Sequence, residues 1–138
     1  MRALVQRVSR AEVAIDGRPV ASISSGLVVL LGVAPGDGPE EADRLADRVR
    51  ALRVFDDEQG RMNEALEDRE ILCVSQFTLY ADTRKGNRPS FVGAAPPEVA
   101  EPLYERFCER AGAQRGEFGA RMAVELVNDG PVTLLLES

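Results

Sequence analysis

An apolar stretch that ends at Val74 is directly followed by Ser75-Gln76-Phe77-Thr78, in which three side chains can form hydrogen bonds and the fourth is aromatic. Backbone N–H groups at the end of a strand, together with the Gln76 amide and the Thr78 hydroxyl, can form a polar cup that binds a carbonyl oxygen. Ser and Thr also turn and cap chains in this position without any chemical role. The motif by itself leaves both interpretations open.

The chain contains no histidine and only two cysteines, Cys73 and Cys108. Ser-His-Asp and Cys-His sites are therefore excluded, and so are zinc sites built on imidazole or on four thiolates. Thr78 as a nucleophile would lack its usual activating base. The apolar surroundings of Cys73 predict a reduced core residue. We expect no metal ion and no other cofactor.

Two further segments have both a structural and a functional interpretation. Asn128-Asp129-Gly130-Pro131 has the composition of a hairpin turn. A functional role would require a cis Gly130–Pro131 bond, which the local sequence does not decide. Arg84, Lys85 and Arg88 form a basic loop that either is solvated or contacts phosphates.

The surrounding pattern predicts the elements that position these residues. Residues 11–15 alternate before Asp16-Gly17, which indicates an antiparallel hairpin, and the apolar run 26–33 indicates a central strand buried on both faces. Further strands are predicted at 71–74, 122–127 and 132–136.

Two helices are predicted between these strands. Residues 37–40 form a helix start with Pro39 in the first turn, after which Ala42, Leu45, Val49 and Leu52 recur at helical spacing. A second amphipathic helix is expected between about residues 98 and 111. The predicted fold class is mixed α/β, with curved, barrel-like mixed β-sheets and the two helices packed on the outside.

Length and composition limit the architecture. A chain of 138 residues with a 44 % hydrophobic share is expected to form one domain over residues 1–138. No apolar run approaches the roughly 20 residues of a membrane helix, and the N-terminal residues lack a signal-peptide core, so we expect a cytoplasmic protein without membrane contact. The net charge of −6 leaves the loop around Lys85 locally basic.

Several motifs resemble those of the bacterial and eukaryotic type of D-aminoacyl-tRNA deacylase. Two segments of that family stand intact and in the right order, namely Ser75-Gln-Phe-Thr-Leu79 and Asn128-Asp-Gly-Pro-Val-Thr133. Two further matches lie between them, namely Gly86-Asn-Arg-Pro-Ser-Phe91 and Phe118-Gly-Ala-Arg-Met122. The similarity begins at residue 4 and extends to the last predicted strand.

The resemblance implies a hydrolase that splits the ester of D-aminoacyl-tRNA, and of glycyl-tRNA mischarged on non-cognate tRNA, while rejecting L-aminoacyl-tRNA. It implies a catalytic role for Ser75, Gln76, Phe77 and Thr78, with Thr78 as a nucleophile the weaker option. It also implies a homodimer in which Gly130 and Pro131, joined by a cis bond, complete the partner's pocket as a chiral wall.

The resemblance also implies how the substrate is held. Substrate-binding residues would be Gly130, Pro131, Arg7, Met122 and Asn128, with Arg7 bonded to the turn, and Arg84, Lys85 and Arg88 would bind the acceptor end of tRNA. The alternative is a nucleic-acid-binding module without hydrolysis. That alternative explains the basic loop but leaves the two intact segments unexplained.

Overall fold

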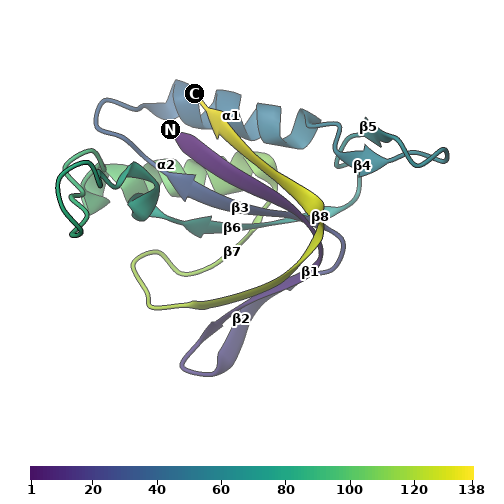
Figure 1. Ribbon diagram of the computed structural model, residues 1–138, viewed down its shortest axis with the longest axis horizontal. Coiled ribbons are helices and arrows are strands. Elements are labelled where there is room, and N and C mark those ends of the chain that lie inside the picture. The colour runs from purple at the N-terminus through teal and green to yellow at the C-terminus, as the bar shows by residue number, and fades with distance from the viewer.

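A single long strand, β1 (Arg2–Ile15), organises the computed structural model, which describes residues 1–138. One edge of β1 pairs antiparallel with β8 (Ala123–Glu137) along almost its whole length. The other edge pairs antiparallel with β3 (Gly26–Gly32) and then with β2 (Arg18–Ile23). Three strands therefore share one partner, and β1 bends sharply together with β8 (Figure 1).

The remaining strands extend the sheet beyond β3. β6 (Glu70–Ser75) runs parallel to β3, and β7 (Gln114–Arg115) runs parallel to β6, which gives the order β2-β1-β3-β6-β7 with β8 on β1. The other elements lie between these strands: α1 (Pro39–Ala51), a hairpin of β4 (Phe55–Asp56) and β5 (Met62–Glu64), the 3₁₀ turn η1 (Phe77–Tyr80) and α2 (Pro97–Ala111). Parallel and antiparallel pairs occur in one sheet, as predicted.

The two faces of β3 belong to two apolar clusters. Leu27, Val29 and Leu31 point into the larger cluster, which also contains Leu45 of α1 and Phe107 of α2. The opposite face of β3, through Val28, packs in a second cluster with residues of β1, β2 and β6, namely Val8, Ala11, Val13, Ile23, Leu72 and Val74. The sheet thus curls over one face of β3 while helices cover the other. The predicted barrel-like mixed sheet with two outer helices is confirmed, and so is the burial of the central strand.

Local turn chemistry explains where β1 and β3 begin and end. Asp16 and Gly17 both have positive φ angles, 50° and 76°, which the tight turn between β1 and β2 requires. The predicted hairpin is therefore confirmed. At Gly26, a Cβ atom would lie 1.9 Å from the Glu70 carbonyl oxygen, so only glycine lets β3 approach β6 this closely.

Both predicted helices are present. α1 has Pro39 in its first turn, and the Gly38 N–H donates a hydrogen bond of 2.7 Å to the Glu41 carboxylate. α2 contains Pro102 within its length and ends at Gly112, which adopts the left-handed conformation with φ of 66°. Neither helix has the length and the apolar character that crossing a lipid bilayer demands.

The hairpin interpretation of Asn128-Asp129-Gly130-Pro131 is wrong. β8 continues through this segment, and both of its halves pair with β1, Val127 opposite Arg10 and Thr133 opposite Gln6. A hairpin would require the two halves to pair with each other. β1 is long enough to pair with both, so residues 129–132 form a bulge, which we call the β8 bulge.

Two ion pairs join the polar sides of α1 and α2. The Nε and Nη2 groups of Arg106 each donate a hydrogen bond of 2.8 Å to a carboxylate oxygen of Asp43, and the same groups of Arg110 donate two hydrogen bonds of 2.8 Å to Asp47. These arginine hydrogen bonds lower the pKa of both carboxyl groups below their usual range. The four residues recur at a spacing of four on each helix and therefore hold the helices in register.

We expect these ion pairs to make the free energy of unfolding depend on pH. A carboxyl group whose pKa is lowered by folding stabilises the protein fully above its unfolded pKa, about 4, and loses this contribution as the pH falls through the folded value. The variant Asp43→Asn/Asp47→Asn should therefore be less stable than wild type at pH 7, and the difference should shrink between pH 7 and pH 2, as the falling pH protonates the carboxyl groups of the wild type. Urea midpoints at both pH values measure this.

The matched control for the helix pairs is Glu101→Gln/Glu105→Gln, which removes two exposed carboxylates of α2 that form no ion pair. The difference in stability between this control and wild type should not shrink in the same way between pH 7 and pH 2. An Asp43/Asp47 variant whose deficit persisted unchanged at pH 2 would show that something other than the charges stabilises the wild type.

Candidate active site

The segment 75–78 sits at the end of β6, where neighbouring strands fix its shape. The Gln76 N–H donates a hydrogen bond of 2.8 Å to the Leu31 carbonyl, which continues the ladder between β6 and β3. The chain then turns into η1, where the Leu79 N–H bonds the Gln76 carbonyl at 3.2 Å. At Gly32 a Cβ atom would lie 3.2 Å from that same carbonyl oxygen, so a larger residue there would crowd the turn.

Arg2 of β1 secures η1 from its other side. Its guanidinium lies 4.5 Å from the centre of the Tyr80 ring and donates a hydrogen bond of 2.9 Å to the Leu79 carbonyl. Burial, with a smaller contribution from Asp37, raises the pKa of Tyr80 to about 12, so its phenol is protonated at neutral pH. The turn that carries Thr78 is thus attached to both β1 and β3.

A cavity of about 580 Å³ opens beside this turn. It is lined by the end of β6, the loop that leads into α2, and the segment between β7 and β8. Of the residues predicted for the site, Ser75, Gln76, Phe77 and Met122 line the cavity. Thr78 does not line it, but its hydroxyl oxygen accepts a hydrogen bond from the Gln76 side-chain amide. The structure therefore brings these five residues together.

No ionisable side chain lines the cavity. Eleven of its sixteen lining residues are hydrophobic, and the polar side chains are those of Ser75 and Gln76. Cys73 lies behind them, fully buried as predicted, and burial raises the pKa of its thiol far above the usual range. Nowhere in the structure do three or more Cys, Asp or Glu side chains meet in a group that could hold a metal ion. The cavity can bind and orient a substrate, but its side chains supply neither a general base nor a charge.

Three aromatic or apolar parts of this cavity are not predicted by the sequence motifs. Phe91 packs edge to face on Phe77 with ring centres 5.0 Å apart, and Phe118 lies 5.9 Å from Tyr104 of α2. The loop of residues 94–97 completes the wall. Phe91 and Phe118 lie in the two further matching segments, residues 86–91 and 118–122, and an aromatic side chain in an otherwise polar loop is the signal that could have found them.

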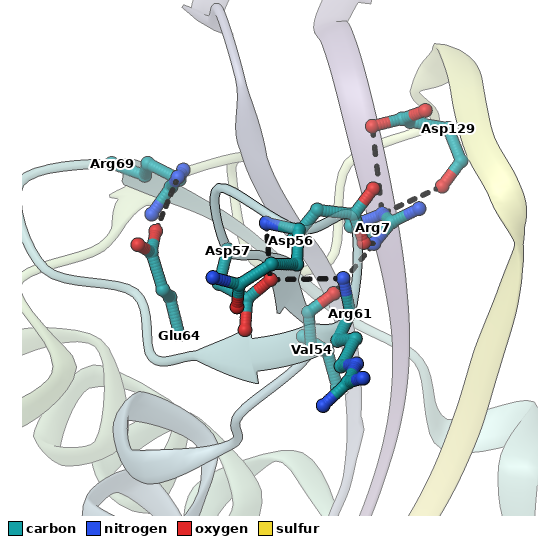
Figure 2. A network of polar contacts seen from close by, with 9 residues as sticks. Arg7, Val54, Asp56, Asp57, Arg61, Glu64, Arg69 and Asp129 are labelled. Carbon is teal, nitrogen blue, oxygen red and sulfur yellow. Dashed lines mark hydrogen bonds and ion pairs between the residues drawn. The ribbon is translucent and has the colours of Figure 1, made fainter.

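The predicted residues Arg7, Asn128, Gly130 and Pro131 form a second group on β1 and β8. The Asn128 side-chain amide donates hydrogen bonds to the Arg7 carbonyl at 3.0 Å and to the Val132 carbonyl at 3.1 Å, closing the base of the β8 bulge. The Arg7 Nε donates a hydrogen bond of 2.8 Å to the Asp129 carbonyl (Figure 2). The Gly130–Pro131 peptide bond is cis. At Gly130 a Cβ atom would lie 2.1 Å from the Val132 nitrogen.

Within one chain the two groups remain apart. β8 reaches the cavity only with its first residues, where Val124 lines the wall beside Met122, while the β8 bulge lies further along the strand. Gly130 and Pro131 are exposed, and none of Arg7, Asn128, Gly130 and Pro131 lines the cavity. One chain therefore presents a cavity at one place and a firmly held, exposed bulge at another.

The three cations of the basic loop are not equally free to bind an anion, although the sequence gives no sign of this difference. Arg84 bonds both carboxylate oxygens of Asp82, at 2.9 and 2.7 Å, and this contact holds the pKa of Asp82 at about 2. Lys85 and Arg88 are exposed and form no ion pair. Two of the three predicted cations are thus free to meet an external anion, while Arg84 already has a partner.

Comparison with known proteins places the whole chain among related sequences. The family model described as D-Tyr-tRNA(Tyr) deacylase matches residues 4–137. A D-aminoacyl-tRNA deacylase of Desulfatibacillum aliphaticivorans is 54 % identical, with 100 % of this chain and 99 % of that protein covered. The corresponding protein of Roseiflexus castenholzii is 56 % identical, with coverage of 100 % and 92 %.

A solved structure shares the fold over the whole chain. The protein named c-Myc DNA unwinding element binding protein is 42 % identical to this chain and superposes with a TM-score of 0.94, covering 100 % of this chain and 99 % of that one. The matches extend through both groups of predicted site residues. Because the family model spans nearly all of the chain and relatives share more than half of its residues, the chain belongs to the D-Tyr-tRNA(Tyr) deacylase family.

Proposed function

We propose that this protein hydrolyses the ester bond between a D-amino acid, or a mischarged glycine, and the terminal ribose of tRNA. The observation that carries this proposal is the cavity beside residues 75–78, in a chain that shares more than half of its residues with full-length proteins named D-aminoacyl-tRNA deacylase. The products are free tRNA and the free amino acid. Because aminoacyl-tRNA is consumed by translation, we expect the protein to act in the cytoplasm.

The absence of ionisable groups from the cavity fits this reaction. Water adds to the ester carbonyl carbon, the bond from that carbon to the ribose oxygen breaks, and the ribose oxygen takes up a proton. An aminoacyl ester is already activated, and the neighbouring ribose hydroxyl can assist the attack. In this proposal the backbone N–H groups and the Gln76 amide stabilise the developing oxyanion, a role in which one donor contributes about 10²–10³ in rate.

Rejection of L-amino acids requires a rigid wall that does not depend on the side chain. We assign this role to Gly130 and Pro131 of the partner subunit in a homodimer. An L side chain would collide with this backbone, whereas D side chains point away and glycine has none. Support comes from the β8 bulge, which is exposed and firmly bonded but does not reach its own cavity, and from the apolar Leu134 and Leu135, 38 % and 55 % exposed on β8.

A nucleic-acid-binding module without hydrolysis is not favoured. The name of one similar structure refers to DNA binding, yet the more similar full-length relatives are named as deacylases. Incubation with D-tyrosyl-tRNA at catalytic enzyme concentration distinguishes the two functions. Loss of the ester supports the hydrolase, and binding without loss supports the module.

The first prediction from this function separates positioning from nucleophilic catalysis. Thr78→Ala should keep initial rates on D-tyrosyl-tRNA within about tenfold of wild type, because it removes one hydrogen bond to Gln76. Gln76→Ala should lose about 10²–10³ in rate as a missing oxyanion donor. Prior chelation of metals should change neither result. A Thr78→Ala enzyme that lost about 10⁴ or more would identify Thr78 as the nucleophile instead.

The second prediction concerns completion of the cavity across a dimer. Gly130→Ala forces the β8 bulge to move, since the new Cβ would lie 2.1 Å from the Val132 nitrogen. Gly130→Ala, whose displaced bulge would no longer complete the partner's cavity and position the D substrate, and Gln76→Ala, which lacks the oxyanion donor, should each be nearly inactive alone. Mixed in equal amounts and allowed to exchange subunits, they should recover about a quarter of wild-type activity, because half of the dimers then contain one intact cavity.

The mixing experiment gives a clear outcome when native mass spectrometry measures the fraction of mixed dimers. A mixture that exchanges subunits but recovers no activity would mean that each chain completes its own cavity. Full activity of a monomeric species at high dilution would contradict the homodimer.

The third prediction concerns the basic loop. Lys85→Ala/Arg88→Ala should lower the log–log salt slope of tRNA binding by roughly 0.7–0.9 for each lost phosphate contact. Arg84→Ala should change the slope less, because Asp82 already neutralises that charge. Arg44→Ala on α1 serves as the control for loss of an exposed cation elsewhere. An unchanged slope in the double variant would leave the loop as a solvated segment.

A further inference from the structure

Arg7 is the only residue with a charged side chain among the buried residues of the chain, at 9 % exposure. A guanidinium in this position must have its N–H groups bonded, because an unpaired buried charge is strongly destabilising. Its partners come from β8 on one side and, on the other, from β4 and from Val54, the residue directly before it. Arg7 therefore joins three strands at one point.

The contacts on the β4 side are as close as those on the β8 side. Arg7 Nη1 donates a hydrogen bond of 2.6 Å to the Val54 carbonyl, and the same nitrogen lies 3.3 Å from the Asp56 carboxylate. On the other side, Nε bonds the Asp129 carbonyl at 2.8 Å and lies 3.4 Å from the Asp129 carboxylate. Figure 2 shows Arg7 between the Asp129 side and the Val54 and Asp56 side.

The planar guanidinium transmits an orientation from one side to the other. Its nitrogens are fixed relative to one another, so a contact that holds Nη1 also sets the direction in which Nε donates. Nε donates to the carbonyl of Asp129, the residue directly before Gly130. Without a partner for Nη1, the long side chain of Arg7 would gain rotational freedom and Asp129 would lose a fixed donor.

The β4–β5 hairpin is itself firmly built and can serve as an anchor. Phe55 is buried, and the Arg69 guanidinium lies 4.3 Å from the centre of its ring while pairing with Glu64 at 3.5 Å. Asp57 closes the hairpin loop by accepting hydrogen bonds from the Gln59 and Arg61 N–H groups at 2.9 and 3.0 Å. Asp57 forms no hydrogen bond or ion pair with Arg7, although it is the neighbour of Asp56.

We propose that Asp56, together with the Val54 carbonyl, is a positioning group for the reaction: it orients Arg7, and through Arg7 it fixes the β8 bulge that carries Gly130 and Pro131. The β4–β5 hairpin, which lies outside both groups of site residues, thereby becomes a determinant of discrimination between D- and L-aminoacyl-tRNA. This inference rests on the proposed function of the bulge as the chiral wall.

The test compares Asp56→Asn with Asp57→Asn, which makes the same change of charge on the adjacent residue. Asp56→Asn should lower the D-over-L ratio of kcat/KM by up to about fivefold, because an ion pair with a half-exposed carboxylate contributes at most about 1 kcal/mol, while Asp57→Asn leaves the ratio unchanged. Asp56→Glu, which restores the carboxylate, should recover part of the ratio. Thermal unfolding of all variants shows whether they are equally folded.

A second measurement does not depend on activity. Exchange of the Arg7 Nε proton with water, followed by ¹⁵N NMR, should be about tenfold faster in Asp56→Asn than in wild type or Asp57→Asn, since the donor is held less firmly. If wild type did not hydrolyse D-aminoacyl-tRNA but this difference appeared, the proposed function would fail while the link from Asp56 to Arg7 stood.

Two results would overturn the inference. One is an Asp56→Asn variant with both wild-type selectivity and wild-type Nε exchange. The other is an equal loss of selectivity in Asp56→Asn and Asp57→Asn, because the effect would then come from the hairpin or its charge and not from the contact with Arg7.

Discussion

The antiparallel pairing of β1 with β8 is the interaction on which both candidate functional regions depend. It places residues 2–14 beside residues 123–137, so Arg7 meets the β8 bulge although the two are separated by more than 100 positions. On its other edge β1 pairs with β3, which in turn carries β6 and the segment 75–78. One strand thus fixes the position of the bulge relative to the cavity, and its bend lets the sheet curl over the second apolar cluster.

The cavity is suited to a reaction that needs position more than acid–base chemistry. Its polar side chains, those of Ser75 and Gln76, stand against a mainly apolar wall that includes Phe91 and Phe118. Hydrogen bonds in such surroundings are stronger than in water, because the local dielectric constant is lower. An ester that is already activated can be cleaved under these conditions, whereas an amide or a phosphodiester would need stronger catalysis. The chemistry of the cavity and the proposed substrate therefore agree.

Arg7 shows how a buried charge can organise a distant loop. It brings β1, β4 and β8 together through hydrogen bonds to two carbonyl groups, and two half-exposed carboxylates balance its charge. Such an arrangement is costly to disturb, since removing either side leaves buried N–H groups without partners. The β8 bulge owes its fixed shape to these contacts and to Asn128. The chiral wall that we propose for Gly130 and Pro131 would need that rigidity.

Much of the fold and part of the site follow from the sequence alone, because they rest on local pattern. Apolar spacing predicted α1 and α2, the unbroken run at residues 26–33 predicted a strand buried on both faces, and Asp16-Gly17 predicted a tight turn. The family motifs singled out residues 75–78 in the same way. The absence of histidine excludes whole classes of catalysis by composition alone, because no arrangement of the chain can supply an imidazole that it does not contain.

Only the tertiary structure decided which strand pairs with which. Asn128-Asp129-Gly130-Pro131 has the composition of a hairpin, and it forms a bulge because the distant strand β1 pairs with both halves of β8. Phe91 and Phe118 join the cavity, and Asp56 joins Arg7, through contacts between segments far apart in the chain. Local propensity carries no information about such partners, because their pairing is settled by the packing of the whole sheet.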